Sequence, residues 1–279
     1  MPHTAIAYIP LTTYPEAVTD QAILAATRFA AMLGYELHVS VFSVDIPQVY
    51  APLGGLLLDV PGLVRAAEEK SSAECQRLRN VLAGPREPQT RVTCSVRESL
   101  LGTTRDIAAA EARYYDCSFL PWSGETVAVQ DISEAVIFNS GRPAILVPPS
   151  TRPDRLDHIA IAWDESRVAA RALGDALSLL PKGGRVSVLT VRDEKPLSGP
   201  DIAALLATSL GRRGIEARSL LIDRGDRTIA EALQDTALAE GAQVLAMGGF
   251  GHSRMRDFVL GGATCGVLAD ARLPVLLVH

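Results

Sequence analysis

A glycine-rich stretch near the C-terminus is the part of this sequence best suited to chemistry. It runs from Met247 to Thr264 and carries glycines at positions 248, 249, 251, 261 and 262. Because glycine has no side chain, neighbouring backbone N–H groups can approach phosphate oxygens closely, and a helix N-terminus adds a favourable potential for anions. The stretch therefore predicts a phosphate-binding loop. The alternative is that these glycines serve only a tight turn and a helix start.

The polar residues of this loop allow two interpretations. Arg254 and Arg256 could clamp a phosphate through their forked guanidinium groups, or they could lie on a solvated helix face. His252 is interpreted as a loop residue, because no carboxylate or nucleophile stands at a recognisable spacing from it. The usual dinucleotide-binding and P-loop glycine spacings are absent from the sequence.

The elements that must position this loop alternate regularly along the second half of the chain. Short apolar runs predict buried strands, and the Ala-rich segments between them have helical periodicity. The predicted strands are 158–163, 184–191, 215–222, 242–248 and 274–278, and the predicted helices are 166–180, 199–213, 226–240 and about 256–271.

The first half repeats the same order of elements, which indicates an internal duplication. Both halves end on a strand that starts after a proline, at Pro143 and Pro274, where a strand need not donate a hydrogen bond. In the first half the predicted strands are 5–10, 36–44, 90–97, 116–121 and 143–147, and the predicted helices are 15–33, 61–83, 101–113 and 127–140.

Strict alternation of strands and helices predicts the fold class: α/β, with two tandem doubly wound domains. Each domain is expected to be a five-stranded parallel, Rossmann-like sheet with helices on both faces. The boundary is expected at the proline-rich segment 148–153, which gives domains 1–150 and 151–279. Gly34 and Gly211 are predicted to end helices, and Asp226 to cap one. Residues 45–61 form an irregular insertion, either a lid or contact surface or a solvent-facing loop.

The glycine spacing resembles a motif of the universal stress protein family. Gly248, Gly251 and Gly261 follow the pattern G-2x-G-9x-G, between the last two strands of a five-stranded unit. ATP-binding members of that family carry this pattern followed by Ser or Thr. The resemblance spans the chain as a tandem pair of family domains, but the motif occurs only in the second.

The resemblance implies a set of residues that would contact an adenine nucleotide. Asp164 would contact the adenine or ribose, and the backbone of Val191 the adenine. The ribose and phosphates would be lined by Gly248, Gly251, Gly261, Gly262 and Ala263, with His252 and Arg254 beside them.

One departure from the family pattern concerns the phosphates. Gly262 stands where the family has Ser or Thr, so the expected hydroxyl is missing, although Thr264 could supply one. Whether ATP, ADP or AMP is preferred therefore stays open. Mg²⁺ is expected only together with the nucleotide, and no catalytic or metal-binding residue of the protein itself is predicted.

The first half is expected to have lost the nucleotide site. Pro121 aligns with the first motif glycine, and the segment from Gly124 to Pro143 spans 19 residues against 23 from Gly251 to Pro274. No Asp follows the first strand. Trp122 and Ser123 leave a different ligand or a partner surface open for this half.

Composition and charge exclude several classes of protein. A hydrophobic fraction of 48% and a charged fraction of 21% indicate a globular protein rather than a disordered one. Residues 1–150 carry 11 Lys and Arg against 16 Asp and Glu, and the second half 16 against 16, so no basic excess indicates nucleic-acid binding. No segment resembles a signal peptide or a membrane span, so a cytoplasmic location is expected. The four cysteines, interpreted as structural thiols, are Cys75, Cys94, Cys117 and Cys265.

Three functions are compatible with these observations. The first is a stress-response protein that binds an adenine nucleotide in its second domain. Its first domain would be a structural pseudo-dimer partner, with strands 143–147 and 274–278 as the candidate contact between the domains, and a homodimer stays open. The second is an interaction or small-ligand-binding protein with a lost nucleotide site. The third, a slow nucleotide hydrolase, ranks lowest, since neither a base nor a metal constellation is identifiable.

Overall fold

The computed structural model describes residues 4–47, 59–84, 90–123, 126–152, 154–192, 199, 201–249 and 262–279. Its elements in the first half are β1 (Ile6–Thr12), α1 (Asp20–Met32), β2 (Glu36–Asp45), α2 (Val60–Ala83), β3 (Val92–Leu100), α3 (Thr104–Ala112), β4 (Cys117–Pro121), α4 (Val127–Asn139) and β5 (Ala144–Val147). Those in the second half are β6 (His158–Ala162), α5 (Arg167–Leu179), β7 (Arg185–Val191), α6 (Ile202–Arg212), β8 (Glu216–Ile222), α7 (Ile229–Ala239), β9 (Val244–Gly248), α8 (Gly262–Ala269) and β10 (Val275–Val278).

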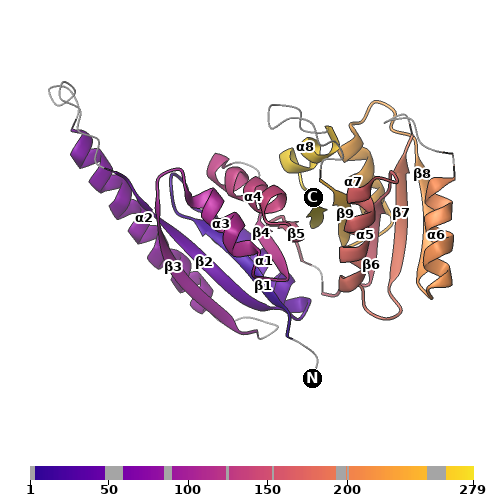
Figure 1. Cartoon of the computed structure of the whole chain (residues 1–279), viewed down its shortest axis with the longest axis horizontal. Helices are drawn as coiled ribbons and strands as arrows, with labels where there is room; N and C mark the ends of the chain where they lie inside the picture. Colours follow the sequence, from indigo (N-terminus) through magenta and orange to yellow (C-terminus); the bar gives the residue numbers. More distant parts are fainter. Residues whose placement is uncertain are drawn as a thin grey trace.

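The strands form one continuous ten-stranded sheet in the order β3-β2-β1-β4-β5-β10-β9-β6-β7-β8. Within each half the five strands are parallel and have the same relative order. The predicted α/β class with parallel strands in both halves is therefore confirmed. In Figure 1 the two halves lie side by side, with the C-terminus between them.

The halves meet at an antiparallel pair between β5 and β10, in which Ile145 faces Leu276. Both side chains are buried, as are their neighbours along the two strands. The junction is thus part of the hydrophobic core, and the possible contact through strands 143–147 and 274–278 is observed. The two five-stranded sets form a single sheet because each terminal strand covers the other's open edge.

The edges of the long sheet explain why it stops at ten strands. The outer strands β3 and β8 are largely exposed, and each carries charged side chains, including Arg97 and Glu98 on β3 and Glu216 and Arg218 on β8. Charged side chains on an edge strand oppose pairing with another chain.

The core between sheet and helices is built mainly from Ala, Val, Ile and Leu, which suits strands covered on both faces. α3 packs against α4, and α7 against α8, while α1 contacts α2. Ala-rich helices permit this close packing because their contact faces are flat.

Three local expectations were wrong. The first helix starts at Asp20 rather than at residue 15, with Thr19 as its N-cap. Asp226 does not cap α7; Thr228 does, in a capping box with Glu231. The Thr228 hydroxyl accepts from the N–H of Glu231, and the Glu231 carboxylate accepts from the N–H of Thr228. Gly211 lies inside α6, and Gly214, with φ +76°, takes the left-handed position after the helix. Gly34, with φ +83°, ends α1 as expected.

Candidate functional site

The candidate site lies at the carboxyl edge of the second half of the sheet. Strand order places β6 between β7 and β9, so the residues that follow these strands meet at one edge. Asp164 follows β6, Val191 ends β7 and Gly248 ends β9. In a parallel α/β sheet this edge, at the point where strand order reverses, is the usual place for a ligand.

Asp164 shapes the turn that leads into α5. Its Oδ1 accepts a hydrogen bond from the backbone N–H of Ser166 at 2.9 Å. Between them Glu165 has a positive φ of 59°, an uncommon conformation for a residue with a side chain. The Ser166 hydroxyl in turn accepts from the N–H of Ala169 at 3.1 Å and caps α5. The carboxylate is half-buried, so a local role and a ligand role are both open to it.

Gly248 is required where β9 meets the first turn of α5. A Cβ built there would lie 2.5 Å from Val168 Cγ2 and 2.9 Å from the backbone nitrogen of Ala169. The next residue, Gly249, donates its N–H to the carbonyl of Val278 at 2.8 Å. Packing therefore accounts for the glycine at 248 whether or not a ligand binds.

The start of α8 supplies the last described part of the site. Gly262 is exposed, Ala263 is half-buried and Thr264 is buried, with 3% of its surface exposed. α8 is held against α7 so closely that a Cβ at Gly266 would lie 2.5 Å from the Cβ of Ala230. This contact fixes where the N-terminus of α8 lies relative to the sheet.

The remaining predicted residues divide into two groups. Val191 is 4% exposed and continues the ladder to Ile222, so only its backbone is placed to meet a ligand. Four predicted residues lie outside the part of the chain that the structure describes, namely Gly251, His252, Arg254 and Gly261.

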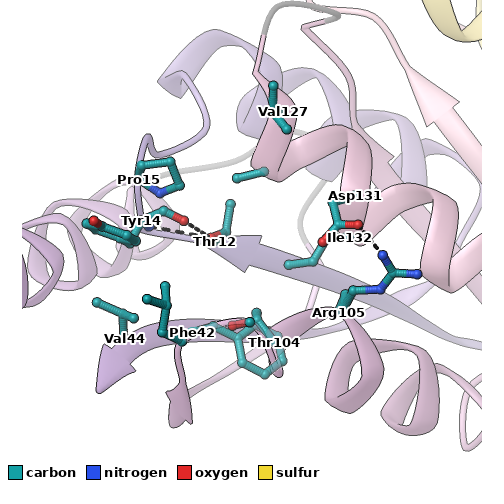
Figure 2. Close-up of a pocket in the computed structure, with 13 residues that line it drawn as sticks. Thr12, Tyr14, Pro15, Phe42, Val44, Thr104, Arg105, Val127, Asp131 and Ile132 are labelled. Atoms are coloured by element: carbon teal, nitrogen blue, oxygen red, sulfur yellow. Dashed lines mark hydrogen bonds and ion pairs between the residues drawn. The ribbon is translucent and has the colours of Figure 1, made fainter. Parts of the chain in front are cut away.

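The first half has a cavity at the corresponding edge, of about 280 Å³. Residues from the ends of β1 and β2 and from the starts of α3 and α4 line it, as Figure 2 shows for Thr12, Phe42, Arg105 and Asp131. Sequence reasoning missed these residues. The alignment of the two halves could have found them, because it places the ends of the first two strands of each half at matching positions.

Trp122 and Ser123, which the sequence suggested for a different ligand, are not among the described residues that line this cavity. Trp122 is 2% exposed and belongs to the core. Its backbone N–H donates to the carbonyl of Val147, which extends the pairing between β4 and β5. Trp122 thus packs rather than lining the cavity.

A polar cluster on the first-half sheet lies away from the cavity. Glu111, from α3, accepts hydrogen bonds from the Tyr8 hydroxyl at 3.0 Å and from the Ser40 hydroxyl at 2.7 Å. It also pairs with Arg97 at 3.0 Å. Burial, followed by the charge of Glu111, raises the pKa of Tyr8 far above its ordinary value. Tyr8 therefore stays neutral and acts as a hydrogen-bond donor.

No metal centre or membrane span emerges from the described residues. Among them, no three His, Cys, Asp or Glu side chains are grouped so that they could hold a metal ion. None of their helices combines the length and apolar character needed to cross a membrane.

Comparison with known proteins assigns the second half to a family. The family model of the universal stress protein family matches residues 155–279. Residues 155–279 form a universal stress protein domain. The match begins two residues after the proline-rich segment and ends at the last residue, so this universal stress protein domain contains β6 to β10 with their helices. No curated protein matches the sequence.

Solved structures extend the likeness to both halves. A universal stress protein from Archaeoglobus fulgidus aligns over 98% of each chain with 18% identity and a TM-score of 0.66. A protein of unknown function from Pseudomonas aeruginosa covers 98% of this chain and 92% of its own, with 15% identity and a TM-score of 0.55. A universal stress protein in complex with cAMP covers 44% of this chain and 97% of its own, with 17% identity and a TM-score of 0.33. The full-length alignments show that the first half shares the tandem fold.

Proposed function

We propose that this universal stress protein binds an adenine nucleotide in its second half, with the first half as a structural partner that has lost the nucleotide site. The observation that carries the proposal is the meeting of three predicted positions at one sheet edge. β6, β7 and β9 are neighbours, so Asp164, the backbone of Val191 and Gly248 come to the same edge. Such an edge is where parallel α/β sheets bind nucleotides.

The chemistry of the described residues fits a nucleotide. Asp164 offers a half-buried carboxylate that can accept hydrogen bonds from ribose hydroxyls or the adenine amine. The exposed Gly262 is the first residue of α8, and the dipole at a helix N-terminus favours a phosphate. Gly251 and Gly261 would complete the phosphate loop, with Ala263 and Thr264 in the helix behind it and His252 and Arg254 alongside. Mg²⁺ would arrive only with the nucleotide.

Binding rather than catalysis is the proposed role. The described groups at this edge are a carboxylate, backbone groups and a helix start, which suit binding, and the stress-response assignment follows from the family of the second half. The protein would act as a sensor or carrier of the nucleotide in the cytoplasm, as a tandem molecule without nucleic-acid or membrane partners.

Equilibrium binding of ATP, ADP and AMP by calorimetry tests the proposal. The wild-type protein should bind at least one of them. Gly251→Val should weaken binding at least about tenfold, because a branched side chain would obstruct the phosphate loop. Asp164→Ala should weaken it to a similar extent. Asp164→Asn, which keeps an acceptor for the Ser166 N–H, separates loss of the carboxylate from loss of the turn.

Two control variants match these changes. Gly211→Val places the same side chain in α6 at an exposed glycine with no neighbour within 4 Å and no positive φ. Asp223→Ala removes an exposed carboxylate just beyond β8. Both controls should bind nucleotide like the wild type. Failure of folded wild-type protein to bind any of the three nucleotides would overturn the proposal.

A further inference from the structure

The cavity in the first half corresponds by strand register to the proposed nucleotide site in the second. In β1 and β2 the residues Thr12 and Phe42 are paired. In β6 and β7 the last pair is Ala162 with Leu189, and two residues further along lie Asp164 and Val191. Counting from the first pair of each ladder, Thr12 matches Asp164 and Phe42 matches Val191. The cavity of the first half therefore lies at the strand positions that correspond to Asp164 and Val191 in the second half.

The walls of this cavity are mainly apolar. Phe42 and Ile132, which are 1% and 5% exposed, contribute from β2 and α4, and Pro15 and Val44 add further apolar surface. Figure 2 shows Pro15 and Thr12 on one side of the cavity and Ile132 on the other. An apolar wall of this kind favours aromatic or aliphatic ligand surface.

The main polar side chains of the cavity already have partners within the protein. Arg105 Nη1 lies 2.5 Å from Asp131 Oδ1, so the charge of the guanidinium is balanced by the neighbouring helix. The Thr12 hydroxyl donates to the carbonyl of Tyr14 at 3.0 Å, and the Thr104 hydroxyl is bonded to that of Ser99 at 2.7 Å. Among the described lining residues no unbalanced cation remains for a phosphate, which argues against a nucleotide.

Buried hydrogen bonds fix the strand ends that line the cavity. The Thr13 hydroxyl donates to the carbonyl of Phe42 at 2.7 Å and is bonded to the Ser71 hydroxyl of α2 at 2.6 Å. That Ser71 hydroxyl also accepts from the N–H of Val44 at 2.9 Å. The ends of β1 and β2 are thereby fixed to α2, so little conformational entropy would be lost when a ligand binds.

Apolar side chains also surround the entrance. Val127, at the start of α4, is 77% exposed, and Leu101, ahead of α3, is 51% exposed, yet both line the cavity. In Figure 2 Val127 stands at the rim. When a ligand covers large exposed apolar side chains beside an apolar cavity, their removal from water favours binding.

We propose that the first half binds a small uncharged aromatic molecule of one or two fused rings at this cavity. Its volume of about 280 Å³ lies near the lower end for small-molecule pockets, which suits on the order of ten to fifteen non-hydrogen atoms. The rings would pack against the lining apolar residues that keep accessible surface, Pro15, Val44, Leu101 and Val127. A single hydroxyl of the ligand would face Thr12 and Thr104, whose hydroxyl oxygens can accept a further hydrogen bond. This site is independent of the nucleotide proposed for the second half.

Binding of 2-naphthol to the full-length protein, followed by ligand-detected NMR and by calorimetry, tests this site. We expect a dissociation constant on the order of 0.1 mM for a probe of this size. Ala128 lines the cavity from the first turn of α4, so Ala128→Leu should fill it and weaken binding at least about tenfold. Leucine is a good helix former, so α4 should persist.

The matched control is Ala204→Leu, the same substitution at an exposed position in the first turn of α6. This variant should bind 2-naphthol like the wild type, and saturating ATP should not displace the probe. Absence of 2-naphthol binding to the wild type, unchanged binding by Ala128→Leu, or displacement by ATP would each overturn the proposal. Because the probe binds without nucleotide, the 2-naphthol result can be interpreted even if the nucleotide-binding assay fails.

Discussion

At the scale of single residues, one acceptor shared by several donors can contribute strongly to stability. Glu111 is the clearest case, since one carboxylate serves the Tyr8 hydroxyl, the Ser40 hydroxyl and Arg97. Tyr8 and Ser40 are both 0% exposed, so their hydroxyls have no access to water, whereas the Arg97 side chain is 54% exposed. Removal of the carboxylate would leave buried donors without an acceptor.

Glu111→Leu should therefore lower the free energy of unfolding by about 2–3 kcal/mol, measured by urea denaturation. The exposed pair between Arg192 and Asp223 provides the comparison, because the Asp223 side chain is 74% exposed. Asp223→Leu should change the free energy of unfolding by no more than about 0.5 kcal/mol. Equal effects of the two substitutions would show that Glu111 is not a buried acceptor.

His158 gives the protein a predicted dependence on pH. Its ring is 2% exposed and lies 2.9 Å from the Ser187 hydroxyl. Burial, followed by the charge of Arg185, lowers the pKa of His158, although Glu240 and Asp157 act in the opposite direction. The unfolded chain therefore binds a proton more readily than the folded one as pH falls through the ordinary histidine range.

The free energy of unfolding should accordingly fall between pH 7 and pH 5.5, the stabilisation being complete above the unfolded pKa. Burial also lowers the pKa of His38, which adds to the same trend. Urea denaturation of the wild type and of His158→Asn at both pH values measures the effect. A slope that is as steep in His158→Asn as in the wild type would assign the pH dependence to other groups.

At the scale of elements, the helices differ in how their starts are capped, and each half contains helices with and without a side-chain cap. α7 begins with a complete capping box, in which the Thr228 hydroxyl accepts from the N–H of Glu231 and the Glu231 carboxylate accepts from the N–H of Thr228. α4 begins at Thr126 without a side-chain cap. The same residue type therefore stands at two helix starts with different hydrogen bonding.

Thr228→Ala should cost about 1 kcal/mol in the free energy of unfolding, because it removes the hydroxyl that caps α7. Thr126→Ala should cost clearly less, since no capping bond is lost. Thermal denaturation of both variants alongside the wild type measures the difference. The prediction is wrong if Thr126→Ala destabilises the protein as much as Thr228→Ala.

Element starts were also where sequence reasoning was least accurate. Apolar periodicity predicts each helix, but the predicted helix 15–33 includes residues that precede the true cap at Thr19. Asp226 and Thr228 both suit a cap by residue type, and only the position of Glu231 three residues after Thr228 decides between them.

At the scale of the whole molecule, the two halves are held together by more than the β5–β10 pair. Arg171 of α5 donates to the carbonyl of His279 at 3.0 Å and to that of Gly141, in the first half, at 2.6 Å. The rings of Phe138 and His279 pack edge to face, 5.6 Å apart. A Cβ at Gly249 would lie 3.2 Å from the Phe138 ring, so the halves fit closely.

Arg171→Ala should weaken this junction and lower the free energy of unfolding by about 1 kcal/mol, a modest value because the side chain is exposed. It should also broaden the calorimetric transition as the two halves become less coupled. Arg167→Ala, one turn earlier on α5 and likewise exposed, should leave both unchanged. Identical calorimetric traces for the two variants would count against Arg171 as a link.

The sequence by itself determined the class of fold, the duplication and the order of all described elements, because alternation of apolar runs and amphipathic segments depends on local periodicity. It also placed Asp164 just after a strand and Val191 and Gly248 at strand ends, which predicted one candidate site. Only the tertiary structure decided that two five-stranded sets form one sheet, that packing against Val168 and Ala169 accounts for the glycine at 248, and that the first half has a cavity at Phe42. These features depend on contacts between segments far apart in the chain, which local periodicity does not encode.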